Sequence, residues 1–313
     1  MPSVETNLAL FRGACTGDMY TVTDALLAGA DVNASSPELP FAPIMAAARW
    51  SDHGMLRLLI DRGADPDRPA ALGLSSVRSR LERSMRPGER ALHIGAKCGN
   101  VETIRLLLER ARADPNATDK KGRTPLLAAC EYEHNNVDLV RLLLDAGADP
   151  TLADEDGETP LHMAARYNLC DLCGMLYNVA PATLNSYTVE HHTPLFMACA
   201  KGHDDMASRL LSLGAVHRMP QDQMHIISSP LVAATVGGFV GVVRVLVNKG
   251  MQAVGGRRNF PMTLYGAVNC SQARILKLLL EVDGEERRSQ WAKPEPMADS
   301  WFTMPLPSAV PPW

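Results

Sequence analysis

The sequence predicts an all-α solenoid of about eight helix-turn-helix repeats with short loops. Apolar residues suited to opening the first, inner helix of a unit recur along most of the chain, at intervals of 33 to 36 residues except for one interval of 48. A unit of this length holds two helices and buries its apolar face only by stacking on its neighbours. These key residues are Leu10, Ile44, Leu92, Leu126, Leu161, Leu195, Leu231 and Leu264.

Signals for helix starts and ends accompany the key residues. Thr-Pro pairs occur at positions 124–125, 159–160 and 193–194, directly before three of them. Proline loses no hydrogen bond in the first turn of a helix, and threonine before it can cap the free N–H groups. Gly147 follows an apolar run and suits the left-handed residue that ends an outer helix. We therefore expect an inner helix after each Thr-Pro pair and an outer helix before each such glycine.

The motifs at the unit boundaries resemble the ankyrin repeat. Thr159-Pro160-Leu161-His162 opens a helix, and Gly63-Ala64-Asp65-Pro66 and Gly147-Ala148-Asp149-Pro150 close units. The resemblance extends over residues 7–284 and implies a stack of helix pairs that binds another macromolecule. In this family the histidine of the opening motif, here His93 and His162, ties neighbouring repeats together through hydrogen bonds.

Two regions of different composition follow from the repeat pattern. Residues 1–284 form the predicted repeat domain, and residues 285–313 are an irregular segment rich in proline and tryptophan. An insertion near residues 68–89 accounts for the long interval, and it is either an amphipathic docking helix or a passive surface loop. The terminal segment is either a second recognition motif or a cover for the apolar end of the last repeat.

Composition and charge indicate the cellular compartment and the class of partner to expect. A net charge of -4 gives no reason to expect a nucleic-acid partner. The sequence does not begin with a signal peptide, and its 7 cysteines form no tight framework, so we expect a cytoplasmic protein, with the nucleus as the alternative. Residues 230–247 are apolar but short, and they contain Arg244, so we expect no transmembrane segment. A capped stack needs no second chain, which predicts a monomer.

The sequence shows no recognisable catalytic or metal-binding motif. The sequence has no Walker loop, no Gly-x-Ser-x-Gly elbow and no His-Glu-x-x-His. Cys170 and Cys173 have the spacing of a redox or zinc pair, but no second pair stands at a suitable separation. Cys130 and Cys199 take positions that alanine fills in other repeats, which predicts packing residues. We therefore expect no enzymatic activity, no cofactor and no metal.

The family resemblance also implies a concave partner-binding groove. It is lined by the loop residue three positions before each key residue and by the residues five and six positions after it. Trp, Tyr and Arg are enriched at interface hot spots, and the predicted set is rich in them. We expect a protein partner with a segment that is acidic and aromatic or aliphatic, bound across the second to sixth repeats. The predicted partner-binding residues are Phe41, Arg49, Trp50, Lys97, Arg123, Tyr132, Arg166, Tyr167, His192 and Lys201.

Other interpretations of these residues stay open at this point. One is that the side chains only fill gaps between repeats. Another is that the chain is a regulatory subunit attached to an enzyme complex, or to a membrane through the arginines of the insertion. We favour an adaptor or scaffold, because a repeat stack offers a long surface and no enclosed pocket for chemistry.

Overall fold

The computed structural model describes residues 3–34, 41–70, 85–131, 135–216, 229–249 and 260–290. Within these ranges the only regular elements are helices, and the predicted all-α fold class is confirmed. The chain divides into two compact units, Met1–Pro194 and Leu195–Trp313, here called unit 1 and unit 2. None of the described helices is long and apolar enough to cross a membrane.

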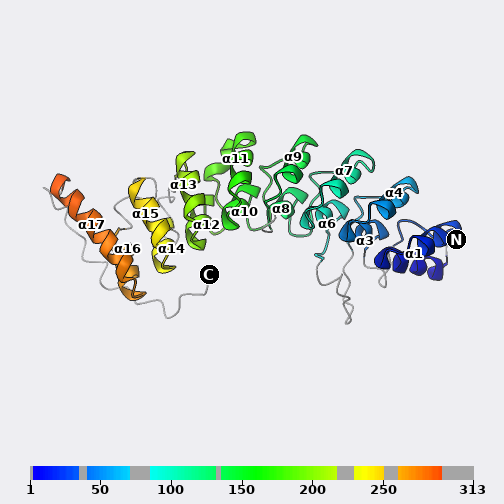
Figure 1. Cartoon of the computed structure of the whole chain (residues 1–313), viewed down its shortest axis with the longest axis horizontal. Coiled ribbons are helices and arrows are strands. Elements are labelled where there is room, and N and C mark those ends of the chain that lie inside the picture. Colours follow the sequence, from blue (N-terminus) through cyan, green and yellow to red (C-terminus); the bar gives the residue numbers. More distant parts are fainter. Residues whose placement is uncertain are drawn as a thin grey trace. The chain divides into compact units, whose positions relative to one another are not determined.

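Unit 1 is a stack of helix pairs (Figure 1). Its helices are α1 (Val4–Thr16), α2 (Met19–Leu27), α3 (Pro43–Trp50), α4 (His53–Asp61), α6 (Ala91–Lys97), α7 (Val101–Glu109), α8 (Pro125–Cys130), α9 (Val137–Asp145), α10 (Pro160–Arg166), α11 (Cys170–Val179) and the 3₁₀ helix η1 (Pro181–Asn185). The inner helices α1, α3, α6, α8 and α10 pack on one another in that order, and the outer helices α4, α7, α9 and α11 do the same. Each repeat therefore packs chiefly on its neighbours.

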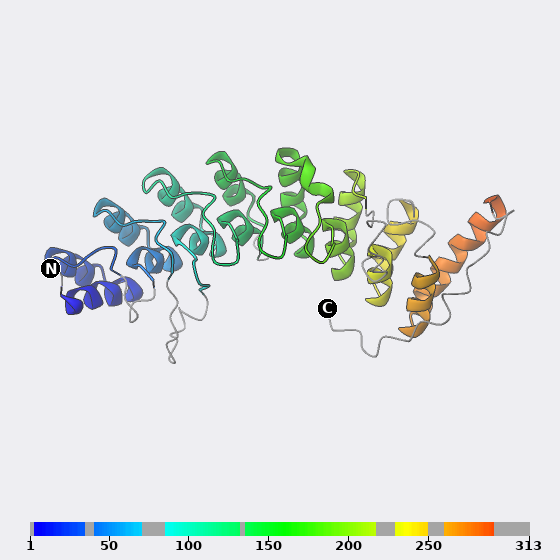
Figure 2. The ribbon, with the colours of Figure 1, turned by 180° about the vertical axis from the view of Figure 1, so that it is seen from behind.

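Unit 2 is also built of helix pairs, coloured from green to orange in Figures 1 and 2. Its helices are α12 (Pro194–Lys201), α13 (Asp204–Ser212), α14 (Pro230–Val236), α15 (Val240–Asn248), α16 (Phe260–Asn269) and α17 (Ala273–Gln290). Helix α15 packs on α13 and α17, and α14 packs on α16. Helix α17 runs through Gly284, where the repeat domain was predicted to end, and stops at Gln290. Residues 291–313 lie outside the described residues.

Each described helix pair turns at a single residue with positive φ, between 30° and 81°. Glycine adopts this left-handed conformation freely, and asparagine tolerates it better than most residues. The described helices form eight such pairs, while the exact number of ankyrin repeats stays a prediction. The turn residues are Gly17, Ser51, Gly99, Asn135, Asn168, Gly202, Gly238 and Ser271.

The key residues lie in the core, as the repeat pattern predicted. Seven of the eight are at most 1% exposed, and only Leu264 of the last pair is partly exposed. The Thr124 hydroxyl accepts a hydrogen bond from the backbone N–H of Leu127 at 3.3 Å, which confirms the predicted cap. Cys130 and Cys199 are fully buried, and burial raises the pKa of Cys130 to about 12. Both are packing residues, as expected.

The insertion is rooted at one point of unit 1. The backbone N–H of Ala70 donates to the carbonyl of Glu89 at 2.8 Å, and the N–H of Gly88 donates back to the carbonyl of Ala70 at 3.0 Å. Met85, next to this root, is buried. Residues 71–84 lie outside the described residues, so the predicted docking helix near 68–89 is not tested there.

Candidate partner-binding face

A ladder of backbone hydrogen bonds joins the loop tips that precede the inner helices of unit 1. The N–H of Lys120 donates to the carbonyl of Pro87 at 3.1 Å, and the N–H of Glu155 donates to the carbonyl of Lys121 at 2.9 Å. The N–H of Val189 donates in turn to the carbonyl of Asp156 at 2.9 Å. Four successive tips are thus held side by side, which fixes the register of every side chain they carry.

Each tip is also closed by one of its own side chains. The Asp119 carboxylate accepts hydrogen bonds from the N–H groups of Lys121 and Arg123, at 2.7 and 3.0 Å. In the next tip the Asp154 carboxylate likewise accepts from the N–H groups of Asp156 and Glu158, at 3.1 and 2.9 Å, and in the last tip the Thr188 hydroxyl accepts from the N–H of His192 at 3.1 Å. Such side-chain-to-backbone bonds set the turn without help from a neighbour.

Two buried histidines tie inner helices to the following tips, as the family resemblance implied. His93 Nε2 lies 2.8 Å from the carbonyl oxygen of Arg123, while its Nδ1 accepts from the N–H of Arg90. His162 Nε2 lies 3.1 Å from the carbonyl oxygen of His192. Burial lowers the pKa of both His93 and His162 to about 4, so each ring is neutral near pH 7 and donates from Nε2. Their role is structural.

The predicted cations of the groove are paired within their own repeats. Lys97, five positions after its key residue, lies 2.9 Å from Oε1 of Glu89, three positions before it. In the next repeat the same two positions hold Glu131 and Arg123, 3.1 Å apart, so that the acid now lies on the inner helix and the base on the loop tip. Arg166 and Glu158 form the third pair. An ion pair therefore closes each of three successive repeats across its loop tip and inner helix.

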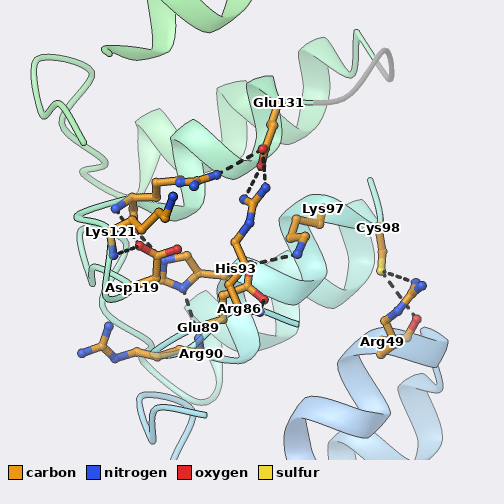
Figure 3. A network of polar contacts seen from close by, with 11 residues as sticks. Arg49, Arg86, Glu89, Arg90, His93, Lys97, Cys98, Asp119, Lys121 and Glu131 are labelled. Carbon is orange, nitrogen blue, oxygen red and sulfur yellow. Dashed lines mark hydrogen bonds and ion pairs between the residues drawn. The ribbon is translucent and has the colours of Figure 1, made fainter. Parts of the chain in front are cut away.

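Glu131 is the centre of this network (Figure 3). Arg86, at the root of the insertion, donates from Nη1 and Nη2 to its two carboxylate oxygens at 2.5 Å each. Burial alone favours the neutral acid, but the hydrogen bonds and charges of Arg86 and Arg123 hold the pKa of Glu131 below its ordinary value. Arg123 Nε also lies 3.9 Å from Asp154, and burial raises the pKa of that carboxyl.

The network leaves no excess of positive charge for an acidic partner. Its four cations and four carboxylates balance, and a bidentate guanidinium-carboxylate pair is already well satisfied. The expectation that these cations face an acidic segment therefore receives no support from the geometry. The members are Arg86, Lys97, Arg123 and Arg166 with Glu89, Glu131, Asp154 and Glu158.

Sequence reasoning missed the ion pairs between the loop tips and the inner helices, and it missed the part of Arg86 in the network. A signal for the ion pairs was present in the sequence. Residues three before and five after the key residue have opposite charges in three successive repeats, and this alternation predicts pairs. Arg86 gave no comparable signal, because it lies in the insertion and has no counterpart in other repeats.

Two predicted site residues lie in the interior, which corrects their expected place on the surface. Phe41 is 1% exposed, and its ring packs against that of Phe11 in the preceding repeat, tilted by 52° with centroids 4.9 Å apart. His192 is 7% exposed, and its Nδ1 lies 3.4 Å from the Glu190 carboxylate. Both side chains join the packing between repeats instead of facing outward.

The other predicted residues are more accessible. Trp50, the last residue of α3, is 56% exposed, and neighbouring Arg49 donates from Nη1 to the Cys98 sulfur at 3.2 Å. Tyr167 is partly buried at the end of α10. Lys201 is exposed on α12 of unit 2, whereas the other described members belong to unit 1. Tyr132 lies outside the described residues.

The part of the chain that the structure describes contains no candidate metal centre. No group of three or more His, Cys, Asp or Glu side chains there could hold an ion. In the Cys170 and Cys173 pair, Cys173 is fully buried in α11 and Cys170 is only partly exposed.

Comparison with known proteins gives the same picture as the geometry. A family model of three consecutive ankyrin repeats matches residues 10–119, 72–154, 92–188 and 133–220, which together cover more than half of the chain. The ankyrin repeat, SAM and basic leucine zipper domain-containing protein 1 of Carollia perspicillata is 30% identical over 141 residues, 44% of this chain and 26% of its own length. The protein of the same name from Ornithorhynchus anatinus is 33% identical over 146 residues, 45% of this chain and 27% of its own.

A viral relative matches a shorter stretch. A putative ankyrin repeat protein of fowlpox virus is 31% identical over 102 residues, which are 33% of this chain and 25% of the viral protein. The chain therefore matches about a quarter of the length of each of these three relatives.

Proposed function

This chain belongs to the ankyrin repeat family, whose repeats are generally protein-protein interaction modules, and from this premise we propose that it is an adaptor or scaffold that binds a protein partner. The proposed partner lies across the inner-helix ends of unit 1. Fold alone does not name a partner, so the proposal rests on the side chains of that face.

The observation that carries this proposal is the exposure of Trp50. Residues Pro43 to Ala48 of the same helix are all buried, so the tryptophan projects from a well-packed element. A tryptophan held in this way offers a large contact area at little cost in conformational entropy, and tryptophan is enriched among interface hot spots. We therefore take Trp50 as the anchor of the proposed interface.

The charge balance of the ion-pair network shapes the proposed partner. Lys97, Arg123 and Arg166 already have carboxylate partners, so an acidic segment must compete with Glu89, Glu131 and Glu158. We therefore propose an aromatic or aliphatic segment as the main contact, and assign charge a minor part in the affinity.

The test is capture of a partner from cell lysate with the intact chain, with Trp50→Ala and with Tyr20→Ala. Tyr20 is a matched control, because it is 82% exposed on α2 and lies outside the proposed face. We expect Trp50→Ala to lose a partner that the intact chain and Tyr20→Ala retain, with a loss in affinity of about 2 kcal/mol for an anchor residue. A partner bound equally by all three proteins contradicts the placement at Trp50.

We also propose that the chain acts as a monomer in the cytoplasm or the nucleus. The reduced state expected of its scattered cysteines supports the compartment. The monomer is supported by the general rule that a repeat stack with capped ends needs no second chain. Light scattering of the purified chain and imaging of a tagged chain test these two statements separately.

A further inference from the structure

Helix α17 carries two apolar stripes, of which one is packed. Ile275 and Leu279 are fully buried, on the helix that packs against α15 and α16. Ala273, Leu276 and Leu280 lie at i, i+3 and i+7 and line a shallow, mainly apolar depression together with Lys277 and Glu281. All of the lining residues belong to α17. We call Ala273, Leu276 and Leu280 the α17 stripe.

Comparison with the preceding outer helices indicates that the α17 stripe is built to be covered. Leu276 is the fourth residue of α17, and the fourth residues of α13 and α15 are Ala207 and Val243. Both of these are fully buried, and α15 packs between α13 and α17. Leu276 is partly exposed and Leu280 is 52% exposed, because no described element of unit 2 packs on this side of α17.

We propose that residues 291–313 of the same chain cover the α17 stripe. This segment follows α17 directly and contains three of the chain's 4 tryptophans, Trp291, Trp301 and Trp313. These are the side chains with the largest apolar area to bury, and they stand in a segment whose prolines limit the entropy lost on ordering.

The reach of the chain fits this occupant. From Leu280 to Gln290 the helix rises roughly 15 Å, at about 1.5 Å per residue. An extended chain spans about 3.3 Å per residue, so a segment folding back from Gln290 reaches the stripe within its first ten residues. A tethered segment also has a far higher effective concentration than a separate chain, which favours this occupant over a second copy.

Tryptophan fluorescence tests the proposal on the full chain. Three variants each keep one of Trp291, Trp301 and Trp313 as the sole tryptophan, and a fourth keeps only Trp50, which is 56% exposed and serves as the reference. We expect at least one terminal tryptophan to emit at shorter wavelength, and to be quenched less by acrylamide, than Trp50. In that variant Leu280→Glu moves the emission to longer wavelength and raises quenching to the level of Trp50.

The control is Val268→Glu, which places the same charge on α16 at a position that is 59% exposed and outside the stripe. It should leave the tryptophan shielded, and circular dichroism should give the same helicity for both glutamate variants. The proposal is overturned if all three terminal tryptophans are quenched as readily as Trp50, if Leu280→Glu has no effect, or if shielding disappears on dilution, which indicates a second copy. None of these results depends on partner binding at Trp50.

Discussion

Arg86 and Glu131 form a bidentate ion pair, with both Nη-to-Oε distances at 2.5 Å, that joins the root of the insertion to the end of α8. Arg123 binds the same carboxylate at 3.1 Å from the loop tip between them. The Glu131 side chain is only 12% exposed, so bulk water cannot replace these partners. One carboxylate thus connects the root of the insertion, 45 residues earlier in the chain, with the loop tip and the inner helix of its own repeat.

Replacing Glu131 by glutamine is therefore expected to destabilise the fold. The change keeps the shape of the side chain but removes the negative charge that pairs with the guanidinium groups of Arg86 and Arg123, and Arg123 keeps only the longer contact with Asp154 at 3.9 Å. Breaking a buried pair in this way is costly, and the partial exposure of Arg86 moderates the cost, so we expect a loss of about 2 kcal/mol in the free energy of unfolding. Urea denaturation at pH 7 measures it.

The control for this change is Glu102→Gln. Glu102 pairs with Arg57 at 3.3 Å and Arg105 at 3.5 Å, but it is 41% exposed. Exposed pairs contribute little, so the expected loss is under about 0.5 kcal/mol. Equal losses in the two variants would show that the network around Glu131 stabilises no more than a surface pair.

Acid is expected to weaken the fold through His93 and His162 before the carboxylates titrate. Burial lowers the pKa of each from 6.5 to about 4, so the unfolded chain binds protons more readily than the folded chain between these values. Stability from the neutral rings is complete above pH 6.5, falls as the pH drops below it, and is lost near pH 4. Between pH 7 and pH 5 each histidine should account for about 2 kcal/mol of this fall.

The measurement is urea denaturation of the intact chain and of His162→Gln at pH 7 and pH 5. Glutamine does not titrate, so the variant begins less stable but should lose about 2 kcal/mol less between the two pH values. An identical pH dependence in both proteins would mean that His162 is protonated in the folded chain or unprotonated in the unfolded one.

The fold followed from local signals in the sequence, because each repeat carries its own. The key leucines and the Thr-Pro pairs act within one unit, and Thr124 caps its helix without help from a neighbour. Burial of Phe41 depends on Phe11 in the preceding repeat, so the pattern of a single repeat could not place it.

The ion-pair network shows a second feature that the pattern of the sequence could not place. The loop position of Arg123 matched the family's groove, but its charge is cancelled by Glu131 eight residues later. Composition along the groove records which charges are present and not which of them are paired. The pairing follows only from the distance between the loop tip and the end of the inner helix.

His191 offers a test of backbone strain at the last loop tip. It adopts φ 62°, whereas the corresponding positions of the two preceding tips are Gly122 and Gly157, at 73° and 76°. A side chain in this region costs about 1–2 kcal/mol, and the greater freedom of glycine in the unfolded chain offsets part of that. His191→Gly should therefore raise the free energy of unfolding by about 0.5 kcal/mol.

The reverse change at the neighbouring tip is the control. A Cβ added to Gly157 meets the Cα of Thr188 at 3.1 Å, in addition to its positive φ. Gly157→Ala should lower stability by about 1–2 kcal/mol, and urea denaturation at pH 7 measures both variants. A loss of stability in His191→Gly would show that the histidine ring makes a contact worth more than the strain.

The partner-binding face is expected to be insensitive to Phe41. Because this ring is buried against Phe11, Phe41→Leu should cost about 1–2 kcal/mol of stability through lost packing. The affinity of the captured partner should nevertheless equal that of the intact chain, whereas Trp50→Ala weakens it. A matching loss of affinity in Phe41→Leu, in protein shown to be folded, would place the interface nearer to the second repeat's loop tip than proposed.

Salt distinguishes the apolar partner proposed here from an acidic one. With Lys97, Arg123 and Arg166 already paired, few counter-ions are displaced on binding. The dissociation constant of the captured partner should therefore change by less than about threefold when sodium chloride rises from about 0.05 to 0.5 M. Charges exposed on both surfaces would be screened over that range, and the affinity would fall by more than about tenfold. So steep a fall would mean that the partner displaces Glu89, Glu131 or Glu158 and binds the released cations itself, in which case Glu158→Gln should tighten the complex at low salt.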